Sequence, residues 1–148
     1  MIEVRDANIT SADAIQLLRE LSDTLKAITG ASGEASFAAE DVENARSAFV
    51  IAYADGIPCG CGALRPLTET TAELKRVYAR PNNQGVGTAI VKALEAKALG
   101  LGYSEIVLET RRVNTAAVAF YQKLGYTECE NYGDYVGRSE AICLRKGI

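Results

Sequence analysis

Residues 71–91 read TAELKRVYARPNNQGVGTAIV, and this stretch decides the fold. Its first part, TAELKRVYA, has the length and composition of a β-strand. Asparagine and glycine residues then interrupt the pattern, at Asn82, Asn83, Gly85 and Gly87. Apolar residues next recur at helical spacing, at Ile90, Val91, Leu94 and Ala98. The stretch therefore predicts a strand that leads through a glycine-bearing turn into a helix.

The turn is a candidate binding site for an anion. Gly85 and Gly87 leave backbone N–H groups unobstructed at the start of the helix, where the helix dipole also favours negative charge. The same glycines would also serve merely to tighten the connection. A Walker loop needs Gly-Lys followed by Ser or Thr, which is absent, and the dinucleotide fingerprint needs Gly or Ala where Ile90 stands. These two phosphate motifs are therefore excluded.

The residues before this stretch predict a strand, a helix and a poorly patterned segment. Apolar and charged residues alternate over residues 2–6, as in a half-buried strand. Apolar residues between positions 10 and 25 follow helical spacing, namely Ile15, Leu18, Leu21 and Leu25. Residues 28–48 are small and acidic, and they predict only a short helix around 40–45.

The remaining segments complete a mixed sheet. Residues 48–54 and 57–64 predict two strands joined by a tight turn at Asp55-Gly56, so that with residues 71–79 they form three antiparallel strands. Later segments predict strands at 106–108, 126–129 and 141–144 and a helix at 115–124 closed by Gly125. The expected fold class is α/β (α+β), with a single mixed, mostly antiparallel twisted sheet that carries helices on both faces.

Composition narrows the class of protein. The chain has 148 residues, of which 48% are hydrophobic and 24% charged, which is typical of one globular domain. Its net charge of −3 argues against a generic nucleic-acid binder or anionic-membrane binder, which would need a dominant basic surface. The N-terminal residues lack a signal-peptide core, so the expected location is cytoplasmic.

A metal site is not expected. The chain contains no histidine and four cysteines, whose spacing does not form a Cys-x-x-Cys pair. Reduced thiols that act as small buried apolar side chains account for them best.

Two segments resemble signatures of a known superfamily. Residues 84–89, QGVGTA, resemble the Q/R-x-x-G-x-G/A signature of the GNAT N-acetyltransferases, and residues 114–126, NTAAVAFYQKLGY, are similar to the family's second cofactor segment. Further stretches are similar to a bacterial, uncharacterised subgroup of the superfamily, so the resemblance covers roughly residues 49–144. Departures are mild, with Gln84 where Arg is frequent, Thr88 at a usually apolar place and Ala89 where Gly is frequent. The resemblance implies one N-acetyltransferase domain over residues 1–148.

The family resemblance also implies where the cofactor binds. The strand ending at Tyr78 is expected to splay from the strand at 106–109, and the pantetheine arm of acetyl-CoA enters the gap between them. No metal is implied. The residues implied to contact acetyl-CoA lie in three short segments, namely Val77, Tyr78 and Ala79, then Gln84, Gly85, Val86, Gly87, Thr88 and Ala89, and finally Asn114 and Ala117. Asn114 also has the position of a helix cap.

The chemistry requires groups that move protons. An ordinary amine is protonated at neutral pH and cannot attack a thioester, so a base is needed. The resemblance implies Glu73 as that base and Tyr121 as the acid that protonates the leaving thiolate. A purely structural Glu73, paired with Lys75 or Arg76, and a purely core Tyr121 are the alternatives. A backbone N–H near Val77 would stabilise the oxyanion.

The sequence leaves the acceptor open. The expected function is direct transfer of an acetyl group from acetyl-CoA to a primary amine of a small molecule, with an amino acid as one candidate, through a ternary complex. Its carboxylate would be held by residues drawn from Arg65, Arg76, Arg111, Tyr132 and Tyr135. The alternatives are a protein lysine or N-terminal acetyltransferase and a non-catalytic acyl-CoA-binding regulatory domain. No nucleic-acid or membrane partner is expected, and family habit makes a homodimer one candidate state.

Overall fold

The computed structural model describes residues 1–81 and 84–148, so the predicted pattern breakers Asn82 and Asn83 lie outside the described residues. The elements are β1 (Ile2–Asp6), α1 (Ala12–Thr29), the 3-10 helices η1 (Glu34–Ser36) and η2 (Ala39–Val42), β2 (Ala48–Ala54), β3 (Ile57–Pro66), β4 (Thr71–Ala79), α2 (Val86–Gly100), β5 (Glu105–Arg111), α3 (Thr115–Lys123), β6 (Thr127–Cys129), η3 (Gly133–Tyr135) and β7 (Ala141–Gly147).

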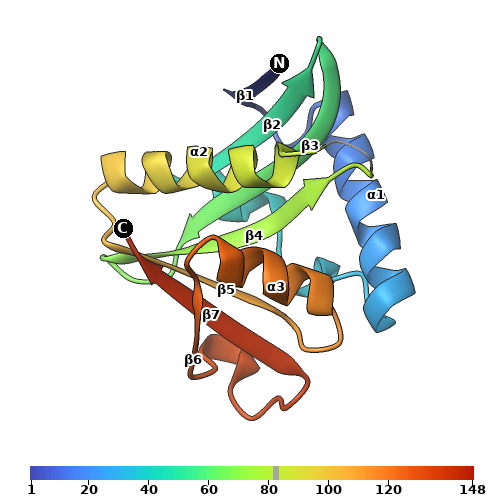
Figure 1. Ribbon diagram of the computed structural model, residues 1–148. Helices are drawn as coiled ribbons and strands as arrows, with labels where there is room; N and C mark the ends of the chain where they lie inside the picture. The colour runs from blue at the N-terminus through green and yellow to red at the C-terminus, as the bar shows by residue number, and fades with distance from the viewer. Residues whose placement is uncertain (82–83) are drawn as a thin grey trace.

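Within the described residues, the strands form a seven-stranded sheet in the order β1-β2-β3-β4-β5-β7-β6 (Figure 1). The β4–β5 pair is parallel, and the other pairs described are antiparallel. Asp55 and Gly56 both have positive φ, as a two-residue hairpin turn between β2 and β3 requires. The predicted mixed, mostly antiparallel sheet is confirmed.

The parallel pair separates after a short contact, and this separation positions the site. Strands β4 and β5 pair only from Thr71 opposite Glu105 to Glu73 opposite Val107, although β4 continues to Ala79 and β5 to Arg111. Beyond Glu73 the two strands therefore diverge and leave their facing backbone groups apart. The predicted splay of the central strands is confirmed.

Arg76 bends β4 at this point. Its φ of 55° lies in the left-handed region, which costs a non-glycine residue on the order of 1 kcal/mol. The Arg76 guanidinium offsets that strain with hydrogen bonds to the carbonyls of Leu18 and Ser32 and to the hydroxyl of Ser22. The bend is thus fixed by contacts to α1 and to the segment after it.

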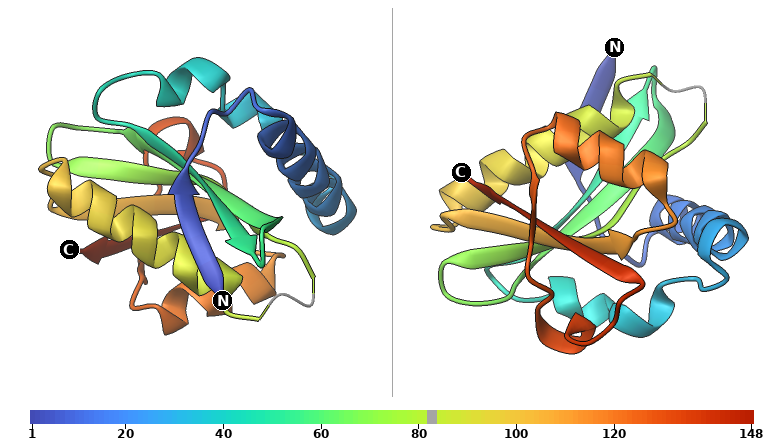
Figure 2. Two further views of the ribbon diagram at one scale, coloured as in Figure 1. Left: turned by 90° about the horizontal axis from the view of Figure 1, so that it is seen from above. Right: turned by 60° about the horizontal axis from the view of Figure 1, so that its bottom comes forward.

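Helices cover both faces of the sheet. Seen from above, α1 and α2 lie on opposite sides of β2 and β3 (Figure 2), and α3 packs in the same apolar cluster as α2. Gly60 and Gly62 of β3 allow α2 to approach closely, because a Cβ on Gly60 would lie 2.8 Å from Val86 Cγ1 and one on Gly62 would lie 2.7 Å from Ile90 Cγ2.

Two predictions for the N-terminal third need correction. The predicted core stripe of α1 is wrong at Ile15, which is 48% exposed, because the buried side chains are Ala14, Leu17 and Leu21. The short helix expected around 40–45 is a 3-10 turn, Ala39–Val42. The face of α1 that packs on the sheet runs through Ala14, Leu17 and Leu21, so it is rotated away from Ile15.

Candidate active site

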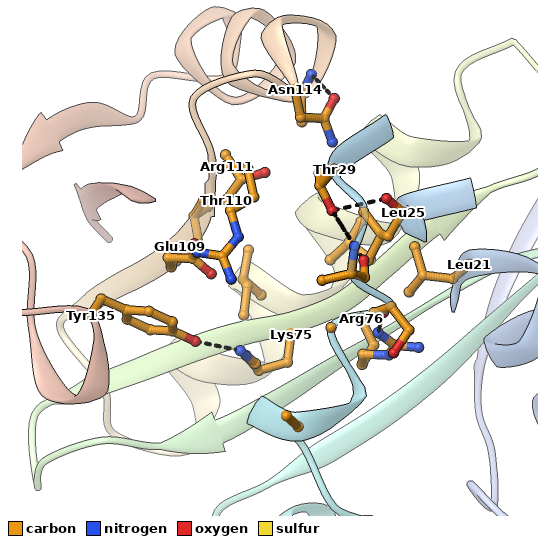
Figure 3. Close-up of a pocket in the computed structure, with 18 of the residues that line it drawn as sticks. Leu21, Leu25, Thr29, Lys75, Arg76, Glu109, Thr110, Arg111, Asn114 and Tyr135 are labelled. Carbon is orange, nitrogen blue, oxygen red and sulfur yellow. Dashed lines mark hydrogen bonds and ion pairs between the residues drawn. The ribbon is translucent and has the colours of Figure 1, made fainter. Parts of the chain in front are cut away.

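A cavity of about 330 Å³ opens where β4 and β5 diverge (Figure 3). Its wall comes from α1 and the segment after it, from both splayed strands, from the start of α3 and from the segment around η3. The lining residues are Leu21, Leu25, Thr29, Ala31, Ser32, Gly33, Ala35, Leu74, Lys75, Arg76, Val77, Leu108, Glu109, Thr110, Arg111, Asn114, Ala117, Tyr121, Asp134, Tyr135 and Arg138. The cavity is therefore formed by four segments that lie far apart in the sequence, at residues 21–35, 74–77, 108–121 and 134–138.

One end of the cavity contains predicted cofactor residues. Val77, Asn114 and Ala117 line it. The Asn114 side chain accepts a hydrogen bond from the backbone N–H of Ala117 at 3.3 Å, so Asn114 caps α3. Asn114 therefore caps the helix through its side-chain oxygen. Because the residue also lines the cavity, its side-chain NH2 group lies near the cavity.

The glycine turn lies outside the cavity, at the start of α2. Gly85 is the N-cap residue with a φ of 82°, and the cap has no side-chain hydrogen bond. The first N–H groups of any helix lack partners within the helix, so this end suits an anion. A Cβ on Gly87 would lie 3.1 Å from the ring of Phe120 in α3. Gly87 therefore lets the two helices that flank the splay approach each other.

The other predicted cofactor residues also surround the splay. Tyr78 is buried against α1, where its hydroxyl donates to Glu20 at 3.1 Å. Ala79, Thr88 and Ala89 are half-buried, Val86 is buried and Gln84 is exposed. These predicted residues thus lie at the end of β4 and at the start of α2.

Tyr121 also lines the cavity. Its ring packs edge-to-face on Phe120 and Tyr126, with centroids 5.0 and 5.7 Å apart. Among the described residues its hydroxyl has no hydrogen-bond partner, and burial raises the pKa of Tyr121. The side chain is therefore a core residue and also holds a protonated hydroxyl at the cavity.

Glu73 is buried in a polar network and does not belong to the described lining of the cavity. The Arg65 guanidinium donates to Oε1 at 2.8 Å, and the Tyr132 hydroxyl donates to Oε2 at 2.5 Å. Arg65 also pairs with Asp41 of η2. The cation that pairs with Glu73 is thus Arg65, where the sequence suggested Lys75 or Arg76.

Glu109 of β5 is the carboxylate that lines the cavity at the splay. Its side chain is only 10% exposed, and its Oε2 atom is buried without a hydrogen-bond partner among the described residues. Burial raises the pKa of Glu109, although Arg111 and Lys75 act in the opposite direction. A buried carboxylate with an unused oxygen next to a cavity is suited to take up a proton.

Lys75 and Tyr135 form the floor next to Glu109. The Lys75 ammonium donates to the Tyr135 hydroxyl at 2.7 Å (Figure 3). Burial lowers the pKa of Lys75, and the charges of Glu73 and Glu109 partly restore it. Tyr135 packs edge-to-face on Tyr132, with ring centroids 5.4 Å apart, so this floor is joined to the network around Glu73.

The predicted carboxylate-binding set is divided by the structure. Arg76, Arg111 and Tyr135 line the cavity, whereas Arg65 and Tyr132 belong to the network around Glu73. Of the three in the wall, Arg76 is held by α1 and Tyr135 by Lys75. Arg111 lies beside Glu109, with Nη1 to Oε2 at 3.8 Å.

Sequence reasoning missed part of the wall. Five residues between positions 29 and 35, together with Asp134 and Arg138, contribute to the wall of the cavity. The weak pattern of residues 28–48 carried no signal for a wall. Glu109 was detectable in principle, because it is a charged residue directly after the apolar run 106–108.

No helix among the described residues is long and apolar enough to cross a membrane. Within the same part of the chain, no cluster of metal-ligating side chains is found.

The fold and the cavity at splayed parallel strands define the class of acyl-CoA-dependent acyltransferases, and comparison with known proteins is consistent with it. The family model of the acetyltransferase (GNAT) family matches residues 15–126. The chain belongs to the GNAT acetyltransferase family, and it is an enzyme of the acyltransferase class.

Individual relatives support the assignment. A protein named IAA acetyltransferase from Azospirillum brasilense is 27% identical over 124 residues, which cover 82% of this chain and 81% of that protein. An uncharacterized N-acetyltransferase of Schizosaccharomyces pombe is 35% identical over 80 residues, covering 52% of this chain and 49% of the relative. The second match thus spans about half of each protein.

Solved structures agree with the fold. The crystal structure of a proposed acyl-CoA N-acyltransferase from Klebsiella pneumoniae is 27% identical and has a TM-score of 0.82, covering 99% of this chain and 97% of that one. PaiA N-acetyltransferase from Thermoplasma acidophilum, solved in complex with coenzyme A, has a TM-score of 0.79 at 22% identity, with 100% and 99% covered. The latter likeness shows the fold.

Proposed function

We propose that this enzyme transfers the acetyl group of acetyl-CoA to a primary amine of a small molecule, by direct transfer within a ternary complex. The observation that carries the proposal is the cavity at the splay. Its wall contains Tyr121, the cap of α3 and a carboxylate with an unpaired buried oxygen, Glu109. A thioester donor and an amine acceptor would meet in this cavity.

The residues present fit acetyl-CoA. The separated backbone of β4 around Val77, Tyr78 and Ala79 offers groups that no longer pair with β5, and the first turn of α2, from Gly85 to Ala89, offers N–H groups for the pyrophosphate. When bound, acetyl-CoA supplies an acetyl group that is activated as a thioester.

Glu109 is the proposed proton acceptor. It lines the cavity, its Oε2 atom is unused among the described residues, and its raised pKa brings the carboxyl closer to neutrality, which suits a general base. Glu73 is the second candidate, implied by the family pattern. Its oxygens accept from Arg65 and Tyr132, so it would act only through that network.

Tyr121 is the proposed proton donor to the departing thiolate. Its buried hydroxyl remains protonated at neutral pH because burial raises its pKa. A backbone N–H near Val77 is the proposed donor to the oxyanion, since a preorganised N–H stabilises developing charge without reorganisation.

The charge of the cavity argues against a basic peptide as the acceptor. A protein lysine or N-terminal acetyltransferase would be supported by a broad acidic groove, whereas this cavity is lined by Lys75, Arg76, Arg111 and Arg138 against only two carboxylates. A non-catalytic acyl-CoA-binding domain remains the candidate from another class.

Two measurements on one sample distinguish these functions. Acetyl-CoA binding is measured by calorimetry, and free thiol is then followed with amino acids, simple alkyl amines, polyamines, aminoglycosides and basic peptides as acceptors. Saturable binding with thiol release that depends on a small amine supports the proposal. Release with peptides alone favours the protein acetyltransferase, binding without release favours the regulatory domain, and absence of binding overturns the acetyl-CoA assignment.

A further inference from the structure

The charge of the cavity differs in sign from that of the whole chain. The chain carries a net charge of −3, yet the cavity is lined by four cationic side chains and two carboxylates, namely Lys75, Arg76, Arg111, Arg138, Glu109 and Asp134. A local excess of positive charge in an acidic protein attracts an anionic group. The ligand of this cavity is therefore expected to carry negative charge near its binding end.

Two of the four cations are already used in holding the wall. Arg76 donates hydrogen bonds to Leu18, Ser22 and Ser32, which fixes β4 to α1. Lys75 donates to the Tyr135 hydroxyl. These contacts keep the side chains in place and leave them less able to reorient toward a ligand.

Arg111 and Arg138 are the cations that remain. Among the described residues, neither guanidinium makes a side-chain hydrogen bond. Arg111 Nη1 lies 3.8 Å from Glu109 Oε2 and 3.5 Å from Glu140 Oε1, distances that allow attraction without a hydrogen bond. Arg138 is exposed and lines the same cavity.

Opposite charges therefore lie side by side in the cavity wall with unused hydrogen-bonding capacity. Glu109 Oε2 and Arg111 Nη1 are both buried, and neither has a hydrogen-bond partner in the described part of the chain. Buried polar atoms in native proteins nearly always have partners, so such an exception calls for an explanation. A ligand that carries an ammonium and a carboxylate would satisfy both atoms at once.

We propose that the acceptor is a free amino acid, whose ammonium group binds Glu109 and whose carboxylate binds Arg111, with Arg138 as a second cation for the carboxylate. This inference rests on the proposed function, because it names the acceptor of the same site. Guanidinium groups bind carboxylates through paired N–H donors, which suits Arg111 to this role. Glu109 then holds the amine that it is proposed to deprotonate.

The apolar part of the wall selects the side chain of the amino acid. Leu21, Leu25, Ala31 and Ala35 face the cavity opposite β5. A small or medium apolar side chain would bury its surface there, which favours binding through the hydrophobic effect. Leucine is therefore the first acceptor to test.

The test compares leucine with two analogues that lack the carboxylate charge, leucinamide and isopentylamine. We expect the wild-type kcat/KM to be roughly 100-fold higher for leucine than for leucinamide, because a charged hydrogen-bonded pair is lost with the amide. In Arg111→Gln the leucine-to-leucinamide ratio of kcat/KM should fall toward 1, mainly through a higher KM for leucine. Arg138→Gln should reduce the ratio to a smaller extent, because Arg138 is exposed.

Arg112→Gln is the matched control. Arg112 is the next residue, it is exposed, it pairs with Glu128 at 2.7 Å, and it does not belong to the cavity lining. This variant should keep the wild-type ratio. Acetyl-CoA affinity measured on every variant separates loss of the acceptor site from loss of the cofactor site.

Several results would overturn the inference. Equal kcat/KM for leucine and leucinamide across a panel of apolar amino acids and their amides would show that no carboxylate is recognised, and an unchanged ratio in Arg111→Gln would show that Arg111 does not recognise it. If no amine is acetylated, the proposed function fails, and calorimetry of leucine in the presence of coenzyme A then decides alone. Binding that Arg111→Gln abolishes supports the acceptor site, and absence of binding overturns it.

Discussion

Two carboxylates on neighbouring strands, Glu73 of β4 and Glu109 of β5, are both largely hidden from solvent but differ in their partners. Their side chains are 2% and 10% exposed. Glu73 accepts hydrogen bonds from Arg65 and Tyr132, whereas Glu109 keeps one oxygen unused among the described residues and lines the cavity. Each oxygen of Glu73 already accepts a hydrogen bond, whereas Oε2 of Glu109 is left to accept a proton or a ligand beside the cavity.

Replacing each carboxylate by the amide of the same shape should have very different effects on activity. We expect Glu109→Gln to lower kcat/KM for the acceptor by about 1,000-fold, since general-base catalysis contributes on that scale. Glu73→Gln should lower it by much less, because its effect reaches the cavity only through the network. Thiol-release kinetics measure both. A larger loss in Glu73→Gln than in Glu109→Gln would reverse the assignment of the base.

Removing the arginine beside each carboxylate should lower the free energy of unfolding by different amounts. Arg65→Ala leaves Glu73 and Asp41 without their shared cation in a buried network, and we expect it to lower the free energy of unfolding by about 3 kcal/mol. Arg111→Ala removes a cation that makes no hydrogen bond to Glu109, so its cost should be smaller. Urea denaturation of both variants provides the comparison, and equal losses would show that the two pairs are energetically alike.

Tyr121→Phe tests the proposed proton donor. A thiolate is a moderately good leaving group, because thiols titrate near ~8.5, so loss of the proposed acid should reduce kcat only about tenfold. Among the described residues the hydroxyl makes no hydrogen bond, so stability should barely change. Unchanged kcat would assign Tyr121 to packing alone.

The raised pKa of Glu109 makes a prediction about pH. Because burial disfavours the ionised form, Glu109 destabilises the fold once it is ionised, and this cost grows as pH rises from the ordinary carboxyl range through the higher pKa of the folded state. Glu109→Gln should therefore gain stability at neutral pH, by about 1 kcal/mol, and lose that gain in acid. Thermal unfolding at several pH values measures it, and a gain that persists in acid would show that ionisation of Glu109 is not its cause.

The sequence predicted most strands, helices and turns correctly, because residue spacing and turn residues determine these elements locally. The strand, glycine turn and helix of residues 71–100 and the hairpin at Asp55-Gly56 follow from spacing and from positive φ, and the structure confirms them. The splay of β4 from β5 came from the family resemblance and was also confirmed. Spacing alone would not predict it, because it depends on a bend at Arg76 that distant contacts hold.

The acceptor side could not be predicted from the sequence. Residues 29–35 lack periodicity, and their place in the wall depends on tertiary contacts such as the hydrogen bond from Arg76 of β4 to the Ser32 carbonyl. Glu73 and Glu109 are both glutamates within predicted strands, so the sequence does not distinguish them. Tertiary packing gives Glu73 a hydrogen bond from Tyr132 and leaves Oε2 of Glu109 without a hydrogen-bond partner among the described residues. Partners far apart in the chain decided which carboxylate faces the cavity.

The most direct test of the central claim is the simultaneous measurement of coenzyme A and N-acetylated acceptor when the protein is incubated with acetyl-CoA and a mixture of apolar amino acids. We predict that both products form in equal amounts, only with acceptor present, and that Glu109→Gln abolishes nearly all of this formation while it still binds acetyl-CoA. Coenzyme A released without any acetylated amine, or equal formation in wild type and Glu109→Gln, would contradict it.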